Sequence, residues 1–224
     1  MKKLLIFCIT VLLLLVAGWF FIPSFRGFLY YQYFITIKKE VVGGPCGPNC
    51  DGYMEYGDRV LSPVDTLPDF AVNDTNRIKL FGTIYKKDGR PASGVILYVF
   101  QANTSGIYPL RGDEIGAAKI NGYLRGWIKT GKDGTYSLFT NIPGSYPGTK
   151  KIAHIHCIIK EANLNPYTLP NFVFPGDPNL TSVELNTPQD KNGGLVIPIG
   201  VDSTGIMVYK RDLFLGRGVI NYPK

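Results

Sequence analysis

The chain has 224 residues, with 24 Lys or Arg against 17 Asp or Glu and a formal net charge of +7. The basic residues are scattered, which argues against the clustered basic stripe of a nucleic-acid-binding protein. Gly and Pro are abundant and the apolar runs are short, so we exclude long-helix and repeated βαβ architectures and expect an all-β fold.

The first predicted element is a signal anchor over residues 1–37. Lys2 and Lys3 precede an uncharged apolar stretch at residues 4–22. A bilayer span needs about 20 apolar residues, whereas a signal-peptide core has about 7–15. Aromatic residues up to position 34 fit a membrane-interface belt. We therefore expect a membrane-anchored domain exported to the periplasm or the outside. Cleavage near Val16-Ala17-Gly18, giving a secreted protein, is the alternative.

Residues 38–67 are expected to form an irregular linker rich in Gly, Pro and Cys. Cys46 and Cys50 lie in a turn-rich run, where a disulfide would close a small loop in an oxidising compartment. Metal binding by this pair is the alternative, but no second Cys or His pair stands near it. We favour the disulfide, which agrees with export.

Residues 68–224 are predicted to be one β-sandwich or barrel domain. Asp88-Gly89 and Asp133-Gly134 supply turn chemistry between short apolar runs, and long loops follow Gln101 and Pro143. Strands are expected at residues 77–85, 95–101, 123–130, 135–139, 153–160, 172–174, 195–199 and 205–210.

The two histidines of the chain, His154 and His156, stand one residue apart in an apolar run. Side chains at i and i+2 of a strand point to the same face, so the pair forms half of a metal site. An isolated pair of this kind is more often a half-exposed surface feature without a ligand. Cys157 follows on the opposite face and is expected to be a small buried apolar residue.

Two tyrosines lie in loops that are suited to present them. Tyr108 follows the strand that ends near Gln101, and Tyr146 lies in the Pro/Gly turn Pro143-Gly144-Ser145-Tyr146-Pro147. Each tyrosine taken singly is more often a packing residue, and the chain has 14 of them. Together with His154 and His156 they supply two oxygen and two nitrogen donors.

The order of these motifs resembles the intradiol ring-cleavage dioxygenases, which include the catechol and protocatechuate dioxygenases. The resemblance covers residues 78–177 and depends mainly on the Tyr…Tyr…His-x-His order. It implies a β-sandwich that holds mononuclear non-haem Fe(III), with Tyr108, Tyr146, His154 and His156 as ligands and Tyr146 displaced by substrate. The supporting segments are Gly82-Thr83-Ile84-Tyr85, Asp88-Gly89-Arg90-Pro91, Gln101-Ala102-Asn103, Asp133-Gly134-Thr135-Tyr136 and Phe174-Pro175-Gly176-Asp177.

The resemblance implies O2-dependent cleavage of a catechol-like aromatic diol between its two hydroxylated carbons, without an organic cofactor. Ferric iron is a hard cation that suits anionic oxygen donors with imidazole. Besides Tyr146, the candidate catalytic residues are Lys151, where these enzymes often have Arg, and Asn171, where Gln is common. Phe100 stands where Trp is frequent.

The alternative is a non-enzymatic cell-surface β-sandwich, similar to transthyretin-like and carboxypeptidase-regulatory-like domains. Such modules share the Gly-Thr-Ile and Asp-Gly-x-Tyr motifs, but a non-enzymatic module does not require Tyr108, His154 and His156 together. The ligand set therefore favours the enzyme. The oligomeric state does not follow from the sequence.

Overall fold

The computed structural model describes residues 7–11, 13–14, 41–44, 46, 48–70 and 76–223. Most of the signal anchor expected over residues 1–37 falls outside them, so the anchor stays a prediction. Residues 7–11 and 13–14 are helical. Among the residues that the structure describes, no helix combines the length and the apolar character needed to cross a membrane.

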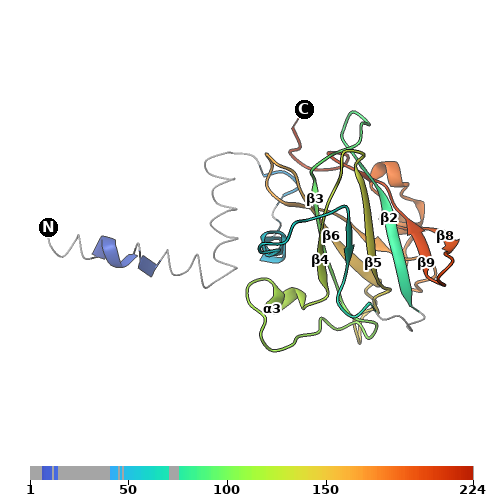
Figure 1. The fold of residues 1–224 in the computed structure, drawn as a ribbon, viewed down its shortest axis with the longest axis horizontal. Coiled ribbons are helices and arrows are strands. Elements are labelled where there is room, and N and C mark those ends of the chain that lie inside the picture. The colour runs from blue at the N-terminus through green and yellow to red at the C-terminus, as the bar shows by residue number, and fades with distance from the viewer. Residues whose placement is uncertain are drawn as a thin grey trace.

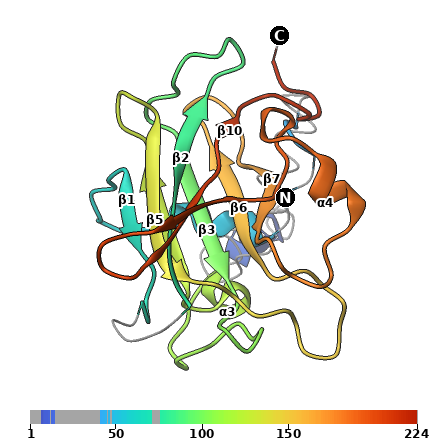
Figure 2. The ribbon, with the colours of Figure 1, turned by 90° about the vertical axis from the view of Figure 1, so that its right-hand side faces the viewer.

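The domain consists of two β-sheets that pack face to face (Figures 1 and 2). This confirms the predicted all-β sandwich. The first sheet has the order β1 (Val64–Thr66), β5 (Thr135–Asn141), β2 (Arg77–Tyr85), β9 (Met207–Lys210) and β8 (Ile197–Val201), and β10 (Leu213–Phe214) pairs with β2. The second sheet has the order β4 (Arg125–Lys129), β3 (Ile96–Gln101), β6 (His154–Lys160) and β7 (Tyr167–Val173).

The main core lies between the two sheets. In β2, buried and half-buried residues alternate strictly, so Ile78, Leu80 and Ile84 point inward. They meet residues of the second sheet that include Val99 and Cys157. Full burial of an aliphatic side chain contributes roughly 1.5–3 kcal/mol. Burial also raises the pKa of the Cys157 thiol to about 12, which agrees with the expected inert, buried cysteine.

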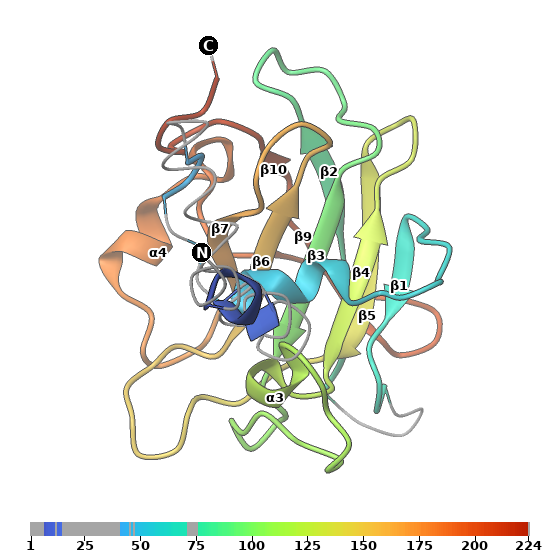
Figure 3. The same cartoon turned by 90° about the vertical axis from the view of Figure 1, so that its left-hand side faces the viewer.

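A second apolar cluster covers the outer face of the second sheet. The 3-10 helix η1 (Pro48–Met54) lies across this face, coloured cyan in Figure 3. We call the buried residues beneath and within it the outer cluster: Cys50, Tyr53, Tyr98, Phe100, Trp127 and Ile158. Because this cover is present, β3 is buried on both faces over most of its length.

The segment expected as an irregular linker, residues 38–67, is therefore more ordered than predicted. It contributes η1 to the outer cluster and β1 to the first sheet, where β1 pairs with β5 in parallel. The seven residues of the 3-10 helix have no apolar period. A strand of three residues is also too short for an alternating pattern.

The predicted strands of the sandwich are all present, with shifts of a few residues at their ends. The largest difference is β7, which begins at Tyr167 rather than residue 172. Pro166 and Pro170 disfavour a central strand, but β7 is an edge strand, where proline is tolerated. Besides η1 and β1, the unpredicted elements are β10, the helices α3 (Ala118–Asn121) and α4 (Ser182–Asn186), and the 3-10 helix η2 (Gln189–Lys191).

Arg211 is fully buried next to the main core, and its guanidinium lies 4.6 Å from the centre of the Phe172 ring. Its Nη2 donates to the Asn192 carbonyl oxygen at 3.4 Å, whereas Nε and Nη1 have no hydrogen-bond partner among the described residues. Burial lowers the pKa of this guanidinium.

We expect Arg211→Met to be neutral or to stabilise the fold by about 1–3 kcal/mol, because it removes a buried charge that has no ion-pair partner in the described part of the chain and retains the apolar stem. Urea unfolding measures the change. Arg217→Met is the control, because that guanidinium also stacks on a phenylalanine but is only half-buried. A large loss of stability specific to Arg211→Met would contradict the prediction.

Candidate metal centre

His154 and His156 project to the same side of β6, as their spacing predicts. Both rings are half-buried, whereas the intervening Ile155 is buried in the main core. Their Nε2 atoms lie 3.2 Å apart. The strand alternation alone therefore brings two imidazole nitrogens to one point.

A β-bulge lies opposite His156 at the edge of the second sheet. Ile155 pairs with Phe172 and Cys157 pairs with Leu169, so Pro170 and Asn171 together face the single residue His156. Bulges change the direction in which side chains project and are frequent beside functional sites. Here the bulge turns Pro170 and Asn171 into the wall of the pocket above the histidines.

Two glycines interlock the loops that carry the tyrosines. Gly106 has φ +78°, and a Cβ there would lie 1.9 Å from the Ser145 carbonyl oxygen. A Cβ at Gly144 would lie 2.3 Å from the Thr104 carbonyl oxygen, and the Gly144 N–H donates to the Asn103 carbonyl oxygen at 2.9 Å. Only residues without a side chain allow these backbones to approach so closely. This approach places Tyr108 beside Tyr146.

The four predicted ligands form a closed ring of donor atoms. Tyr108 Oη lies 2.7 Å from His156 Nε2, and Tyr146 Oη lies 3.2 Å from His154 Nε2. The two tyrosine hydroxyls hydrogen-bond to each other, and the two histidine nitrogens complete the ring. Metal bonds of about 2.0–2.2 Å to oxygen and nitrogen place neighbouring donors about 3 Å apart. The spacing of the four atoms therefore fits ligands around one ion.

The surroundings hold both imidazoles in states that can bind a metal. The His154 Nδ1–H donates to the Ile152 carbonyl oxygen at 2.7 Å, which leaves the lone pair on Nε2. The His156 ring stacks on Phe100 with a centroid distance of 4.0 Å and an interplanar angle of 11°. Burial, and secondarily the nearby His154, lower the pKa of His156 to about 3. His156 is therefore neutral at ordinary pH.

Burial raises the pKa of Tyr108 far above its usual value, and the hydrogen bond that its hydroxyl donates to Tyr146 adds to this effect. Without a cation, the Tyr108 hydroxyl therefore keeps its proton. A bound cation reverses this preference by stabilising the phenolate. The donor set of two phenols and two imidazoles matches a hard, highly charged ion better than one that prefers thiolates.

A pocket of about 610 Å³ opens on one side of this ring. Tyr146, His154 and His156 line it, whereas Tyr108 lies behind them and packs against the outer cluster. Of the other predicted catalytic residues, Lys151 is exposed at the pocket and Asn171 is half-buried in its wall. Tyr146 is thus the tyrosine that a bound molecule can reach.

The opposite wall of the pocket was not predicted. It comes from α4, the end of η2 and the residues that follow η2, and includes Val183, Glu184, Lys191 and Asn192. The Glu184 carboxylate accepts hydrogen bonds from the backbone and hydroxyl of Thr181 in a capping box. The pattern Thr181-x-x-Glu184 is a sequence signal for this helix start, but nothing local in the sequence indicates that the helix faces the histidines.

Asp177 has a positioning role that the sequence did not reveal. Its Oδ2 accepts from the Ala153 N–H at 2.7 Å, and its Oδ1 accepts from the Asn179 N–H at 2.8 Å. We expect Asp177→Ala to cost about 1–3 kcal/mol, because the Ala153 N–H at the start of β6 loses its partner. Metal affinity should fall about 10–100-fold, as is usual for residues that orient ligands.

Titration with a competing chelator and urea unfolding measure the two effects of Asp177→Ala. Asp133→Ala is the matched control, because its carboxylate holds a turn remote from the histidines, between β4 and β5. Equal metal affinity in the Asp177→Ala protein and the unchanged chain would contradict the assigned role.

Comparison with known proteins identifies the family of this chain. The family model described as Dioxygenase matches residues 62–190. Catechol 1,2-dioxygenase 1 of Acinetobacter lwoffii is 28% identical over 167 residues, which is 64% of this chain and 52% of that protein. The protocatechuate 3,4-dioxygenase beta chain of Burkholderia cepacia is 28% identical over 203 residues, or 81% of this chain and 85% of that one. The chain belongs to the intradiol dioxygenase family.

Solved structures show the same fold. The dioxygenase domain of a dioxygenase–carbohydrate-binding fusion from a cellulolytic Streptomyces has a TM-score of 0.51 at 25% identity, covering 71% of this chain and 94% of that one. A catechol 1,2-dioxygenase from Acinetobacter has a TM-score of 0.53 at 18% identity, covering 87% and 70%. The chain spans about half the length of the curated Acinetobacter enzyme.

Proposed function

We propose that this protein is an intradiol dioxygenase that binds ferric iron through Tyr108, Tyr146, His154 and His156. Its substrate would be a catechol-like aromatic diol, which O2 opens between the two hydroxylated carbons. The observation that carries the proposal is the closed ring of four donor atoms at the floor of a pocket. Family membership supports the reaction class.

Ferric iron, when bound, supplies the Lewis acidity that draws in the diol oxygens and makes the ring reactive towards O2. Tyr146 is the pocket-facing tyrosine, so it would be the ligand that substrate displaces. Its phenolate oxygen would then accept one hydroxyl proton of the diol. Tyr108 is fixed between the outer cluster and His156 and retains its place.

The remaining residues hold and shield the substrate. His154 and His156 keep fixed ring orientations through Ile152 and Phe100. The Lys151 ammonium, at the open side of the pocket, supplies positive charge towards an anionic diolate. Asn171, on the bulge, offers an amide that can donate to or accept from a ring substituent.

The test is oxygen uptake by the iron-loaded protein with a panel of catechols and hydroquinols, together with its visible spectrum. Two coordinated tyrosinates predict a broad visible charge-transfer band and uptake that depends on iron. Removing the iron with a chelator should abolish both, and adding Fe(III) back should restore them. A colourless protein that retains no iron would rule out the proposal.

We further propose that the domain works outside the cytoplasm, attached through residues 1–37 or secreted after their cleavage. The apolar stretch at residues 4–22 and the disulfide between Cys46 and Cys50 support an oxidising compartment. Fractionation of the host cell, with carbonate washing of membranes, tests this location. Recovery of the reduced protein in the cytoplasm would contradict it.

A further inference from the structure

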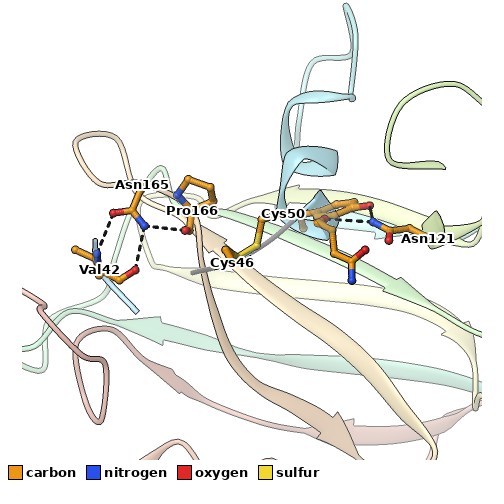
Figure 4. The surroundings of a disulfide bond; sticks show 8 residues. Val42, Cys46, Cys50, Asn121, Asn165 and Pro166 are labelled. Atoms are coloured by element: carbon orange, nitrogen blue, oxygen red, sulfur yellow. Dashed lines mark hydrogen bonds between the residues drawn. A yellow bond between two sulfur atoms is a disulfide. The ribbon is translucent and has the colours of Figure 1, made fainter. Parts of the chain in front are cut away.

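The disulfide between Cys46 and Cys50 marks the start of η1 (Figure 4). Their Cα atoms are 5.7 Å apart, a usual separation for a disulfide. Cys50 is buried in the outer cluster, and Cys46 packs against that cluster from its edge. We call residues 46 and 48–55, from this disulfide to Glu55, the strap. The strap packs across the outer face of the second sheet.

The strap holds the chain that follows Tyr108. Glu55 is central, because its carboxylate accepts from a backbone N–H at the start of α3 and pairs with an arginine of β4. Main-chain oxygens of η1 accept from two further side chains. The contacts are Ala117 N–H to Glu55 Oε1 at 2.8 Å, Arg125 to Glu55 Oε2, Asn121 Nδ2 to the Asn49 carbonyl at 3.2 Å and Trp127 Nε1 to the Gly52 carbonyl at 2.8 Å.

This segment in turn holds Tyr108. A Cβ at Gly122 would lie 2.8 Å from the Pro109 carbonyl oxygen and 3.2 Å from the Tyr108 carbonyl carbon. The Tyr123 N–H donates to that same Pro109 oxygen at 3.1 Å. The Tyr108 ring also packs against the outer cluster, 6.1 Å from the centre of Phe100. A continuous set of contacts thus joins the disulfide to one predicted metal ligand.

We propose that the disulfide-closed strap is a positioning element for Tyr108. This inference rests on the proposed function, because it assigns the strap a role at that metal centre. A single short 3-10 helix is not stable alone, so η1 depends on the disulfide and on its contacts with the sheet. Without the disulfide, the strap detaches more often, and the Tyr108 segment loses the Glu55 carboxylate and the two carbonyls that hold it.

The centre is consequently sensitive to thiol reductants. An external dithiol would be oxidised to its own disulfide while Cys46 and Cys50 each gain one electron and one proton. The two thiols then leave the strap open. In this way the redox state of a bond on the outer face of the sheet controls how firmly Tyr108 is held.

Amide hydrogen exchange on the metal-free full chain tests the coupling without reference to iron. In the double variant Cys46→Ser, Cys50→Ser, we expect the Ala117 and Tyr123 amides to exchange about tenfold faster or more. Ala117 loses its hydrogen bond to Glu55, and Tyr123 lies in the segment that the strap holds, where its bond to Pro109 opens more often. Amides of β2 should keep their protection, which shows that the sandwich is folded. Cys8→Ser is the control, because Cys8 is a free, exposed cysteine remote in sequence from the strap. Unchanged exchange at Ala117 and Tyr123 would overturn the proposal.

The iron-loaded full chain supplies the second readout. We expect the double variant to release iron to a chelator about 10–100-fold faster and to shift the visible tyrosinate band. Glu55→Gln, with the disulfide intact, should shift the band in the same direction. An unchanged band and release rate in the double variant would overturn the role in positioning. The unchanged chain could bind no iron while the double variant still shows faster amide exchange. That result would contradict the proposed function, but it would support the coupling between the disulfide and the Tyr108 segment.

Discussion

Tyr108→Phe is expected to remove most of the iron from the protein and to lower kcat/KM by more than about 100-fold. Changes to residues that merely orient ligands cost about 10–100-fold, and this substitution deletes a donor atom. The ring of Tyr108 would remain packed in the outer cluster, so the fold should be retained. Iron content, the visible band and oxygen uptake measure the loss.

A matched control uses the same chemical change at a tyrosine of β2. Tyr85 stacks on Phe214, with ring centres 5.2 Å apart, and lies in the first sheet rather than at the metal centre. Tyr85→Phe should therefore leave the band and the uptake unchanged. If Tyr108→Phe kept a wild-type band, Tyr108 would not be a ligand.

Gly106→Ala is expected to destabilise the fold by roughly 2–5 kcal/mol and to abolish iron binding. The left-handed backbone of this residue costs a non-glycine about 1–2 kcal/mol, and overpacking costs about 1–3 kcal/mol more. The new methyl group would lie 1.9 Å from the Ser145 carbonyl oxygen, so the loops of Tyr108 and Tyr146 must separate. Urea unfolding and iron titration measure the two effects.

Gly148→Ala is the control that separates the cost of a left-handed backbone from the cost of a steric clash. Gly148 has φ +72°, close to the value at Gly106, but a Cβ there would meet nothing within 4 Å. This variant should lose only the backbone contribution of about 1–2 kcal/mol and keep its iron. Equal iron loss in both variants would show that the close approach of the two loops is not what brings the tyrosines together.

The histidine half of the site follows from local sequence, and the tyrosine half does not. His154 and His156 share a face because side chains in any strand alternate, whatever the rest of the fold does. The meeting of Tyr108 and Tyr146 depends on two loops that touch only in the folded protein. Their role was predicted from the order of motifs in a family, not from period or spacing.

The secondary structure likewise divides into elements that the sequence predicts and elements that it does not. Strands with regular alternation, such as β2, are recognisable in the sequence, and β2 has the predicted bounds. The bulge at Pro170 and Asn171, the three-residue β1 and the 3-10 helix η1 carry no periodic pattern. Their positions are set by pairing and burial against residues far away in the chain. For that reason the strap and the far wall of the pocket became visible only in three dimensions.

The most direct test of the proposed function is mass spectrometry of the product formed from a catechol under ¹⁸O₂ by the iron-loaded protein. Intradiol cleavage adds one O2 molecule across the bond between the two hydroxylated carbons. We therefore predict a ring-opened dicarboxylic acid that carries both labelled atoms, formed by the unchanged chain and not by His154→Ala. An unlabelled product, or a ring opened beside rather than between the hydroxylated carbons, would contradict the proposed reaction.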